Sequence, residues 1–184
     1  MANSEKFRIL CVCTANICRS PVAERLLSAR LGPDVTVSSA GTFGLEGSPI
    51  APPMARRLHE IGIRADDFAA RRVTVTTLLA ADLILTMTRK QRSEVVGLAP
   101  ATVRRVFTLP EFARLLSQLR LDDLPSGSLP ERLAAAVRAV GARRSPGTTD
   151  DIDDPYGRSE ADYTRAFAEI ESAAAAFAAL DPAC

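Results

Sequence analysis

Short runs of apolar residues alternate along the chain with longer segments in which apolar residues recur every three or four positions. The short runs are typical of buried strands, and the longer segments are typical of helices that cover a sheet. Strands are predicted at residues 7–12, 35–39, 81–87 and 102–107. Helices are predicted at residues 21–31, 54–61, 89–96, 109–121, 131–140 and 159–180. This order predicts an α/β fold with a doubly wound four-stranded parallel sheet and helices on both of its faces.

The segment between the first strand and the first helix, residues 13–21, reads CTANICRSP. Ser20 is predicted to be the N-cap of the helix, and Pro21 its first residue. A tight loop before a helix presents unpaired N–H groups and the positive end of the helix dipole. Asn16 tolerates the left-handed backbone conformation that a loop this tight needs. The segment is therefore predicted to bind an anion.

Two side chains of this loop predict a reaction at the bound anion. The planar guanidinium group of Arg19 can hold two oxygens of a phosphoryl group. Cys13 is surrounded by amides and lies near this cation, so we expect a thiolate near neutral pH. A thiolate beneath a bound phosphate can attack phosphorus and form a covalent intermediate. The hydroxyl group of Ser20 is expected to donate to the thiolate and to help it leave later.

Cys-x5-Arg-Ser-Pro close to the N-terminus, with residues 16–21 reading NICRSP, resembles the low-molecular-weight protein tyrosine phosphatases. The resemblance implies that Cys13 is the nucleophile and that Arg19 binds the phosphate. The other residues of the implied phosphate-binding loop are Thr14, Ala15, Asn16, Ile17, Cys18 and Ser20.

The sequence SAGT at residues 39–42 also matches a segment of this family, in which the serine supports the asparagine of the phosphate loop. Ser39 is therefore expected to support Asn16. On its own, this quartet would be interpreted as the end of a strand followed by a glycine turn.

Residues 150–154 contain four aspartates, which by composition alone predict an acidic turn before the last helix. The phosphatase reaction, however, needs a carboxylic acid that protonates the leaving oxygen and later takes a proton from water. Asp154-Pro155-Tyr156 resembles the family's general-acid loop, which implies that Asp154 is the acid and that Tyr156 forms a wall of the substrate cleft. Pro155 restricts the backbone of Asp154, and Asp153 is the nearest alternative acid.

Two positions depart from the pattern of the family. Leu45 stands where the family carries a Trp or Tyr as one wall of the cleft, which argues against a strong preference for aromatic substrates. Ala15 stands where the family often has Gly. If that position required a positive φ, alanine would cost about 1 kcal/mol, and slower catalysis is the expected consequence.

Composition limits the classes of function. The chain has 184 residues and a net charge of +1 without a basic run, which argues against nucleic-acid binding. No apolar run is long enough to span a bilayer, and residues 1–6 do not resemble a signal peptide. Three of the four cysteines lie within eight residues, which is unlike a disulfide framework. We expect one cytoplasmic phosphatase domain over residues 1–184, with a helical surface elaboration at about 109–149.

Four alternatives concern the cysteines and the loop. Cys11, Cys13 and Cys18 resemble part of a zinc site, but the sequence offers no second cluster to complete it, so no metal and no cofactor are expected. An arsenate reductase with an internal thiol relay needs downstream cysteines, and none lies between Cys18 and Cys184, although an external thiol could replace the relay. A non-catalytic binder of phosphate or phosphotyrosine needs neither a nucleophile nor an acid. A reversible Cys13–Cys18 disulfide that protects the nucleophile is a further hypothesis.

The sequence thus predicts a metal-independent phosphatase that acts on a phosphotyrosine protein or a small aryl phosphate, with no nucleic-acid or membrane partner. It predicts neither the physiological substrate nor the oligomeric state.

Overall fold

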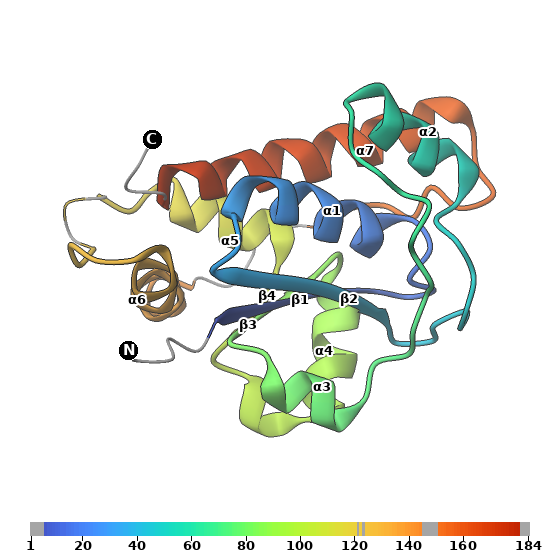
Figure 1. Cartoon of the computed structure of the whole chain (residues 1–184). Coiled ribbons are helices and arrows are strands. Elements are labelled where there is room, and N and C mark those ends of the chain that lie inside the picture. The colour runs from blue at the N-terminus through green and yellow to red at the C-terminus, as the bar shows by residue number, and fades with distance from the viewer. Residues whose placement is uncertain (1–5, 121, 123, 145–150, 181–184) are drawn as a thin grey trace.

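The computed structural model describes residues 6–120, 122, 124–144 and 151–180 (Figure 1). Four strands form one parallel sheet in the order β2-β1-β3-β4. The strands are β1 (Phe7–Cys13), β2 (Val35–Gly41), β3 (Leu83–Thr86) and β4 (Val106–Thr108). The helices are α1 (Arg19–Leu31), α2 (Pro52–Glu60), α3 (Val75–Ala80), α4 (Arg89–Leu98), α5 (Leu109–Leu116), α6 (Leu129–Ala142) and α7 (Glu160–Ala175). The predicted fold class is confirmed.

Helices cover both faces of the sheet, with α1, α5 and α7 on one face and α3 and α4 on the other (Figure 1). In β1, Ile9 and Cys11 belong to the larger core under α1 and α7, whereas Leu10 and Val12 belong to the smaller core on the opposite face. Both faces of β1 are therefore buried, which explains why its sequence is a nearly continuous apolar run.

The bounds of the elements differ from the prediction in several places. The strand predicted at 102–107 is β4, Val106–Thr108, because Pro100–Thr102 form a 3-10 helix that begins at a proline. Helix α3 was not predicted, although Thr74 and Thr77 form a capping box at its start. The last helix ends at Ala175 and continues as the 3-10 helix Ala176–Leu180.

Part of the segment that was expected to be a surface elaboration lies in the core. Helix α5 ends at Leu116 rather than at residue 121, and its Leu109 and Phe112 are fully buried. The ring of Phe112 packs between Phe107 and Phe177, with centroid distances of 5.2 and 5.3 Å. Residues 117–144 form the remainder of this segment as far as it is described, and residues 145–149 lie outside the described residues.

None of the helices in the described parts of the chain combines the length and the apolar character needed to cross a bilayer. Within the same ranges, no three His, Cys, Asp or Glu side chains are grouped so that they could hold a metal ion.

Candidate active site

The 13–19 loop leaves β1 at the carboxyl edge of the sheet, where β1 lies between β2 and β3 (Figure 1). From β1 the chain goes to β2 on one side, and it later returns to β3 on the other side of β1. Where the strand order diverges in this way, a crevice opens beyond the carboxyl ends of the strands. Backbone hydrogen bonds attach the loop to the segment after β2. The N–H groups of Thr42 and Phe43 donate to the carbonyl oxygens of Cys13 and Thr14, each at 2.9 Å.

The thiol of Cys13 is buried at the base of this loop and accepts two hydrogen bonds. The backbone N–H of Asn16 donates to its Sγ at 3.2 Å, and the Ser20 hydroxyl donates at 3.0 Å. Both donors stabilise negative charge on sulfur. The prediction that Ser20 caps α1 was wrong, because the helix begins at Arg19 with Cys18 as its N-cap residue and has no side-chain cap. The Ser20 side chain faces Cys13 instead.

Asn16 supports the loop through its backbone and its side chain. Among the described residues, it is the only non-glycine residue with a positive φ, 58°. Its Nδ2 donates to Ser20 Oγ at 2.9 Å and to Ser39 Oγ at 2.8 Å, and its Oδ1 accepts from the N–H of Arg71 at 2.8 Å. The expected contact with Ser39 is therefore present. Ala15 does not have a positive φ, so the backbone cost considered for alanine there does not arise.

Behind Ser39 lies a buried carboxyl group that sequence reasoning missed. Ser39 Oγ donates to Glu24 Oε2 at 2.5 Å. Burial raises the pKa of Glu24 above its ordinary value, although the Ser39 hydrogen bond acts in the opposite direction. The available signal was helical spacing, because Glu24 lies four residues after Ser20 and hence on the same face of α1.

Arg19 joins the loop to the distant 151–156 segment. Its guanidinium group donates from Nη1 to the carbonyl oxygen of Ile152 at 2.9 Å and from Nη2 to Asp154 Oδ2 at 2.5 Å, across 135 residues of sequence. Its Nε is buried and has no hydrogen-bond partner among the described residues. Because buried N–H donors are nearly always paired, this free donor fits a bound anion.

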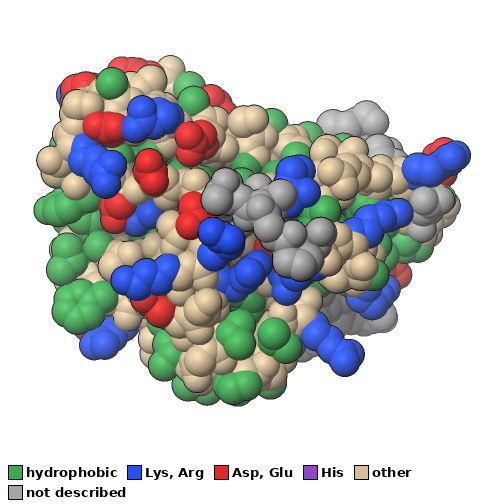
Figure 2. Space-filling model, turned by 180° about the vertical axis from the view of Figure 1, so that it is seen from behind, with side chains coloured by type: hydrophobic (Ala, Val, Ile, Leu, Met, Phe, Trp, Pro, Cys, Tyr) green, Lys and Arg blue, Asp and Glu red, His purple; other side chains and the backbone are tan. Residues whose placement is uncertain are grey.

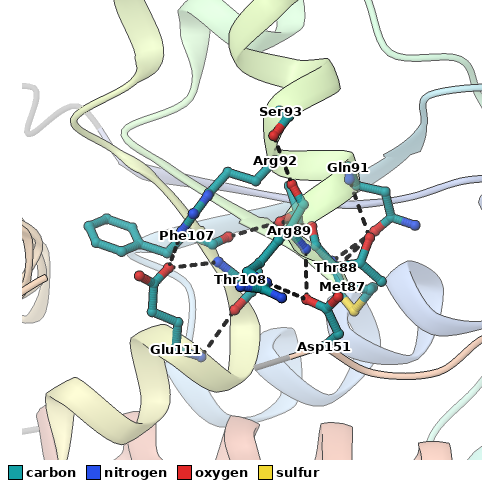
Figure 3. A network of polar contacts seen from close by, with 11 residues as sticks. Met87, Thr88, Arg89, Gln91, Arg92, Ser93, Phe107, Thr108, Glu111 and Asp151 are labelled. Atoms are coloured by element: carbon teal, nitrogen blue, oxygen red, sulfur yellow. Dashed lines mark hydrogen bonds and ion pairs between the residues drawn. The ribbon is translucent and has the colours of Figure 1, made fainter. Parts of the chain in front are cut away.

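The 151–156 segment is held against the ends of β3 and α4. The N–H of Ile152 donates to the carbonyl oxygen of Met87 at 2.8 Å. Figure 3 shows the second attachment, in which the N–H of Arg89 donates to Asp151 Oδ1 at 2.7 Å. Asp154 itself keeps 45% of its side chain exposed. Its carboxyl group is thus held near Arg19 but remains accessible.

Gln91 is a second residue that sequence reasoning missed. Its Oε1 accepts from the N–H groups of Met87 and Thr88 at 3.0 and 3.1 Å (Figure 3). Its Nε2 donates to Thr14 Oγ1 at 3.0 Å. This buried side chain therefore ties the 13–19 loop to the turn after β3. In the sequence, Gln91 is a polar residue in the first turn of a predicted helix. Nothing in that pattern distinguishes a buried glutamine from one on the surface.

The remaining predicted site residues divide into buried and exposed ones. Ile17 and Cys18 are buried, and burial raises the pKa of Cys18 to about 12. Leu45 and Tyr156, which were expected to line the cleft, are 41% and 59% exposed. Phe43 was not predicted; it is 66% exposed, lies in the segment bonded to Thr14, and has the guanidinium of Arg72 5.6 Å from its ring centroid.

Comparison with known proteins gives the family. The family model described as low molecular weight phosphotyrosine protein phosphatase matches residues 8–131. The chain belongs to this family. The relationship predicted from residues 13–21 is confirmed, together with the enzyme class that it implies.

Individual known proteins are similar to this chain over most of their length. The probable phosphatase EpsP of Ralstonia solanacearum is 38% identical over 115 residues, which is 62% of this chain and 76% of that protein. The phosphatase Etp of Escherichia coli K12 is 41% identical over 123 residues, 67% of this chain and 80% of that protein. The structure of the YwlE arginine phosphatase from Geobacillus stearothermophilus superposes with a TM-score of 0.71 at 30% identity and covers 94% of this chain and 90% of that one.

The low molecular weight phosphatase model ends at residue 131, before the 151–156 segment. The role of Asp154 therefore depends on its geometry in this chain, and the individual roles of the site residues remain predictions.

Proposed function

We propose that the chain hydrolyses phosphotyrosine-type phosphomonoesters, on proteins or as small aryl phosphates, through a phosphocysteine on Cys13. The observation that carries this proposal is the contact of Arg19 with Asp154, since it unites the nucleophile's loop with a carboxyl group from the far end of the sequence. Arg19 Nε and the N–H groups of the 13–19 loop are the proposed donors to the phosphate oxygens.

In the first step the Cys13 thiolate attacks phosphorus, the S–P bond forms, and the P–O bond to the leaving group breaks. Asp154 donates its proton to the leaving oxygen. Arg19 and the loop amides stabilise the negative charge on the equatorial oxygens in the transition state.

In the second step a water molecule attacks phosphorus and the S–P bond breaks. The Asp154 carboxylate accepts the proton of this water, and inorganic phosphate is released. The hydrogen bonds from Ser20 and from the N–H of Asn16 stabilise the thiolate that leaves. Asn16 and Ser39 act as supports of the loop. Because this chemistry needs a reduced thiol, a cytoplasmic location is part of the proposal.

A second candidate substrate is phosphoarginine. It is favoured by the similar chain from Geobacillus stearothermophilus named protein-arginine-phosphatase, which is 37% identical over 106 residues. The same residues would serve, because the thiolate attacks phosphorus, the P–N bond breaks, and Asp154 protonates the leaving nitrogen.

Hydrolysis of p-nitrophenyl phosphate in the presence of a metal chelator tests the reaction. We expect turnover by the wild type, no turnover by Cys13→Ser, and a fall in kcat of about 10²- to 10⁴-fold for Asp154→Asn. Asp153→Asn is the matched control and is expected to keep most of the activity. Equal losses in the two aspartate variants would contradict the assignment of the acid.

The substrate class is tested by peptides that carry phosphotyrosine, phosphoarginine or phosphoserine, and by arsenate with an external thiol, compared by kcat/KM. Preference for the phosphotyrosine peptide supports the proposal. Preference for phosphoarginine would replace it with the second candidate, and thiol-dependent reduction of arsenate without phosphatase activity would refute it.

A further inference from the structure

The amino edge of the sheet, opposite the candidate active site, carries a large cavity. The cavity measures about 1030 Å³ and is formed by the residues that precede or begin β1, β3 and β4 together with one side of α6. Figure 1 shows α6 beside these strand ends, away from the loop that follows β1. A volume of this size is typical of pockets for small organic ligands.

The lining of this cavity is strongly basic. Among the described residues, six lining side chains are basic and two, Asp82 and Glu131, are acidic. The whole chain has a net charge of only +1, so positive charge is concentrated at this place. In Figure 2, blue side chains predominate over red ones on the right-hand half of the molecule, the end at which α6 lies. The basic cavity is defined by Lys6, Arg8, Arg104, Arg105, Arg138 and Arg144.

The two carboxylates do not neutralise these cations directly. Asp82 Oδ2 accepts from the backbone N–H of Arg8 at 2.8 Å, and Glu131 Oε2 accepts from the N–H and the hydroxyl of Ser128 at 2.8 and 2.9 Å. Arg105 donates from Nη2 to the carbonyl oxygen of Leu79, and its buried Nε has no hydrogen-bond partner among the described residues. Arg144 is already engaged, because its guanidinium group pairs with Glu111 and donates to the carbonyl oxygens of Val103 and Val106. The guanidinium groups that remain available for a ligand are those of Arg105 and of the exposed Arg104 and Arg138.

Guanidinium groups in a cluster recognise phosphate oxygens by paired hydrogen bonds. Part of the lining is apolar, with Val103 on one side and Ala134 and Val137 of α6 on the other. A ligand with several phosphoryl groups and an organic body would satisfy both parts of the lining. We propose that the basic cavity binds an organic polyphosphate of the nucleoside triphosphate class, at a site separate from the phosphatase centre.

Calorimetric titration of the full chain with ATP, in the presence of a metal chelator, tests this proposal. The double variant Arg104→Glu/Arg138→Glu reverses two exposed charges of the basic cavity and is expected to weaken binding at least about tenfold. Arg64→Glu reverses an exposed charge in the loop after α2 and is the matched control, with unchanged binding expected. Thermal unfolding shows whether each variant is folded.

Arg19→Met removes the guanidinium group of the candidate active site, so ATP binding is expected to persist in it while phosphatase activity is lost. If Arg19→Met does not fold, the Cys13→Ser chain with excess phosphotyrosine provides the same comparison. Absence of ATP binding, equal weakening by Arg64→Glu, or loss of binding in Arg19→Met would overturn the proposal. Tripolyphosphate that binds as tightly as ATP would overturn the assignment of an organic ligand. A negative result in the ATP titration does not change the outcome of the phosphatase assay, so the two proposals are tested independently.

Discussion

The buried carboxyl group of Glu24 gives the sharpest prediction, because it stands behind the residues that support the catalytic loop. Replacement by glutamine keeps an oxygen that can accept the hydrogen bond from Ser39 and removes the ionisable group. Replacement by alanine removes the acceptor and leaves the Ser39 hydroxyl and a small cavity behind. The two variants therefore separate the charge of Glu24 from its hydrogen bond.

The direction of the pKa shift sets the pH dependence. Burial raises the pKa of Glu24 in the folded chain above that in the unfolded chain, so the folded state holds this proton more tightly. The corresponding stability is complete below the unfolded pKa and is lost as the pH rises through the folded pKa. Each unit by which the folded pKa exceeds the unfolded one costs about 1.4 kcal/mol at neutral pH, or about 3–6 °C in Tm for a chain of this size.

Thermal unfolding of wild type and Glu24→Gln between about pH 4 and pH 7.5 measures this effect. We expect similar Tm values at the acidic end and a Tm for Glu24→Gln that rises relative to wild type as the pH increases. Glu24→Ala lacks the same ionisable group and should show the same pH trend as Glu24→Gln, but it should be less stable than Glu24→Gln by about 1–3 kcal/mol at every pH, because the Ser39 donor loses its acceptor. Glu60, exposed on α2, provides the control substitutions, which should leave the pH profile unchanged. A difference between Glu24→Gln and wild type that does not vary with pH would refute the reasoning.

Three further predictions concern the same loop. Gln91→Ala should lower stability by about 1–3 kcal/mol in chemical denaturation, because two N–H groups lose their acceptor, whereas Gln91→Glu keeps that acceptor and replaces only the Nε2 donor to Thr14. Asn16→Ala should cost about 2–4 kcal/mol and lower kcat, because alanine loses three hydrogen bonds and disfavours a positive φ. With iodoacetamide at about pH 8, peptide mass spectrometry should find Cys13 alkylated and Cys18 unmodified, because burial raises the pKa of Cys18 to about 12; equal labelling would contradict this.

The architecture was predictable from the sequence because the strands and helices have distinct periods. β1 and β3 are apolar on both faces. In a chain with amphipathic segments between such runs, this pattern indicates buried strands of a parallel sheet covered by helices. β4 was harder to delimit, because a proline and a 3-10 turn precede a strand of three residues. Helix α3 has only six residues, fewer than two turns, so its apolar residues are too few to establish a period.

The candidate site was predictable where the chemistry depends on residue type and spacing, as it does for Cys13 and Arg19. The supports depend instead on contacts between segments that are distant in sequence. Glu24 meets Ser39 only because α1 packs on β2, and Gln91 meets Thr14 only because β3 lies next to β1. No local pattern encodes such contacts, so they became visible only in the folded chain.

The position of Asp154 follows from the topology of the sheet. Parallel strands end at one edge, so the loop after β1 and the turn after β3 are neighbours in space. The 151–156 segment is attached to that turn through Ile152 and Asp151, and it therefore reaches the loop after β1 even though α4 to α6 intervene in the sequence. Extra residues between α5 and α6 would leave these two attachments unchanged, because the residues that bind Ile152 and Asp151 lie at the end of β3 and the start of α4. The length of the chain between the nucleophile and the acid can thus vary without displacing the acid.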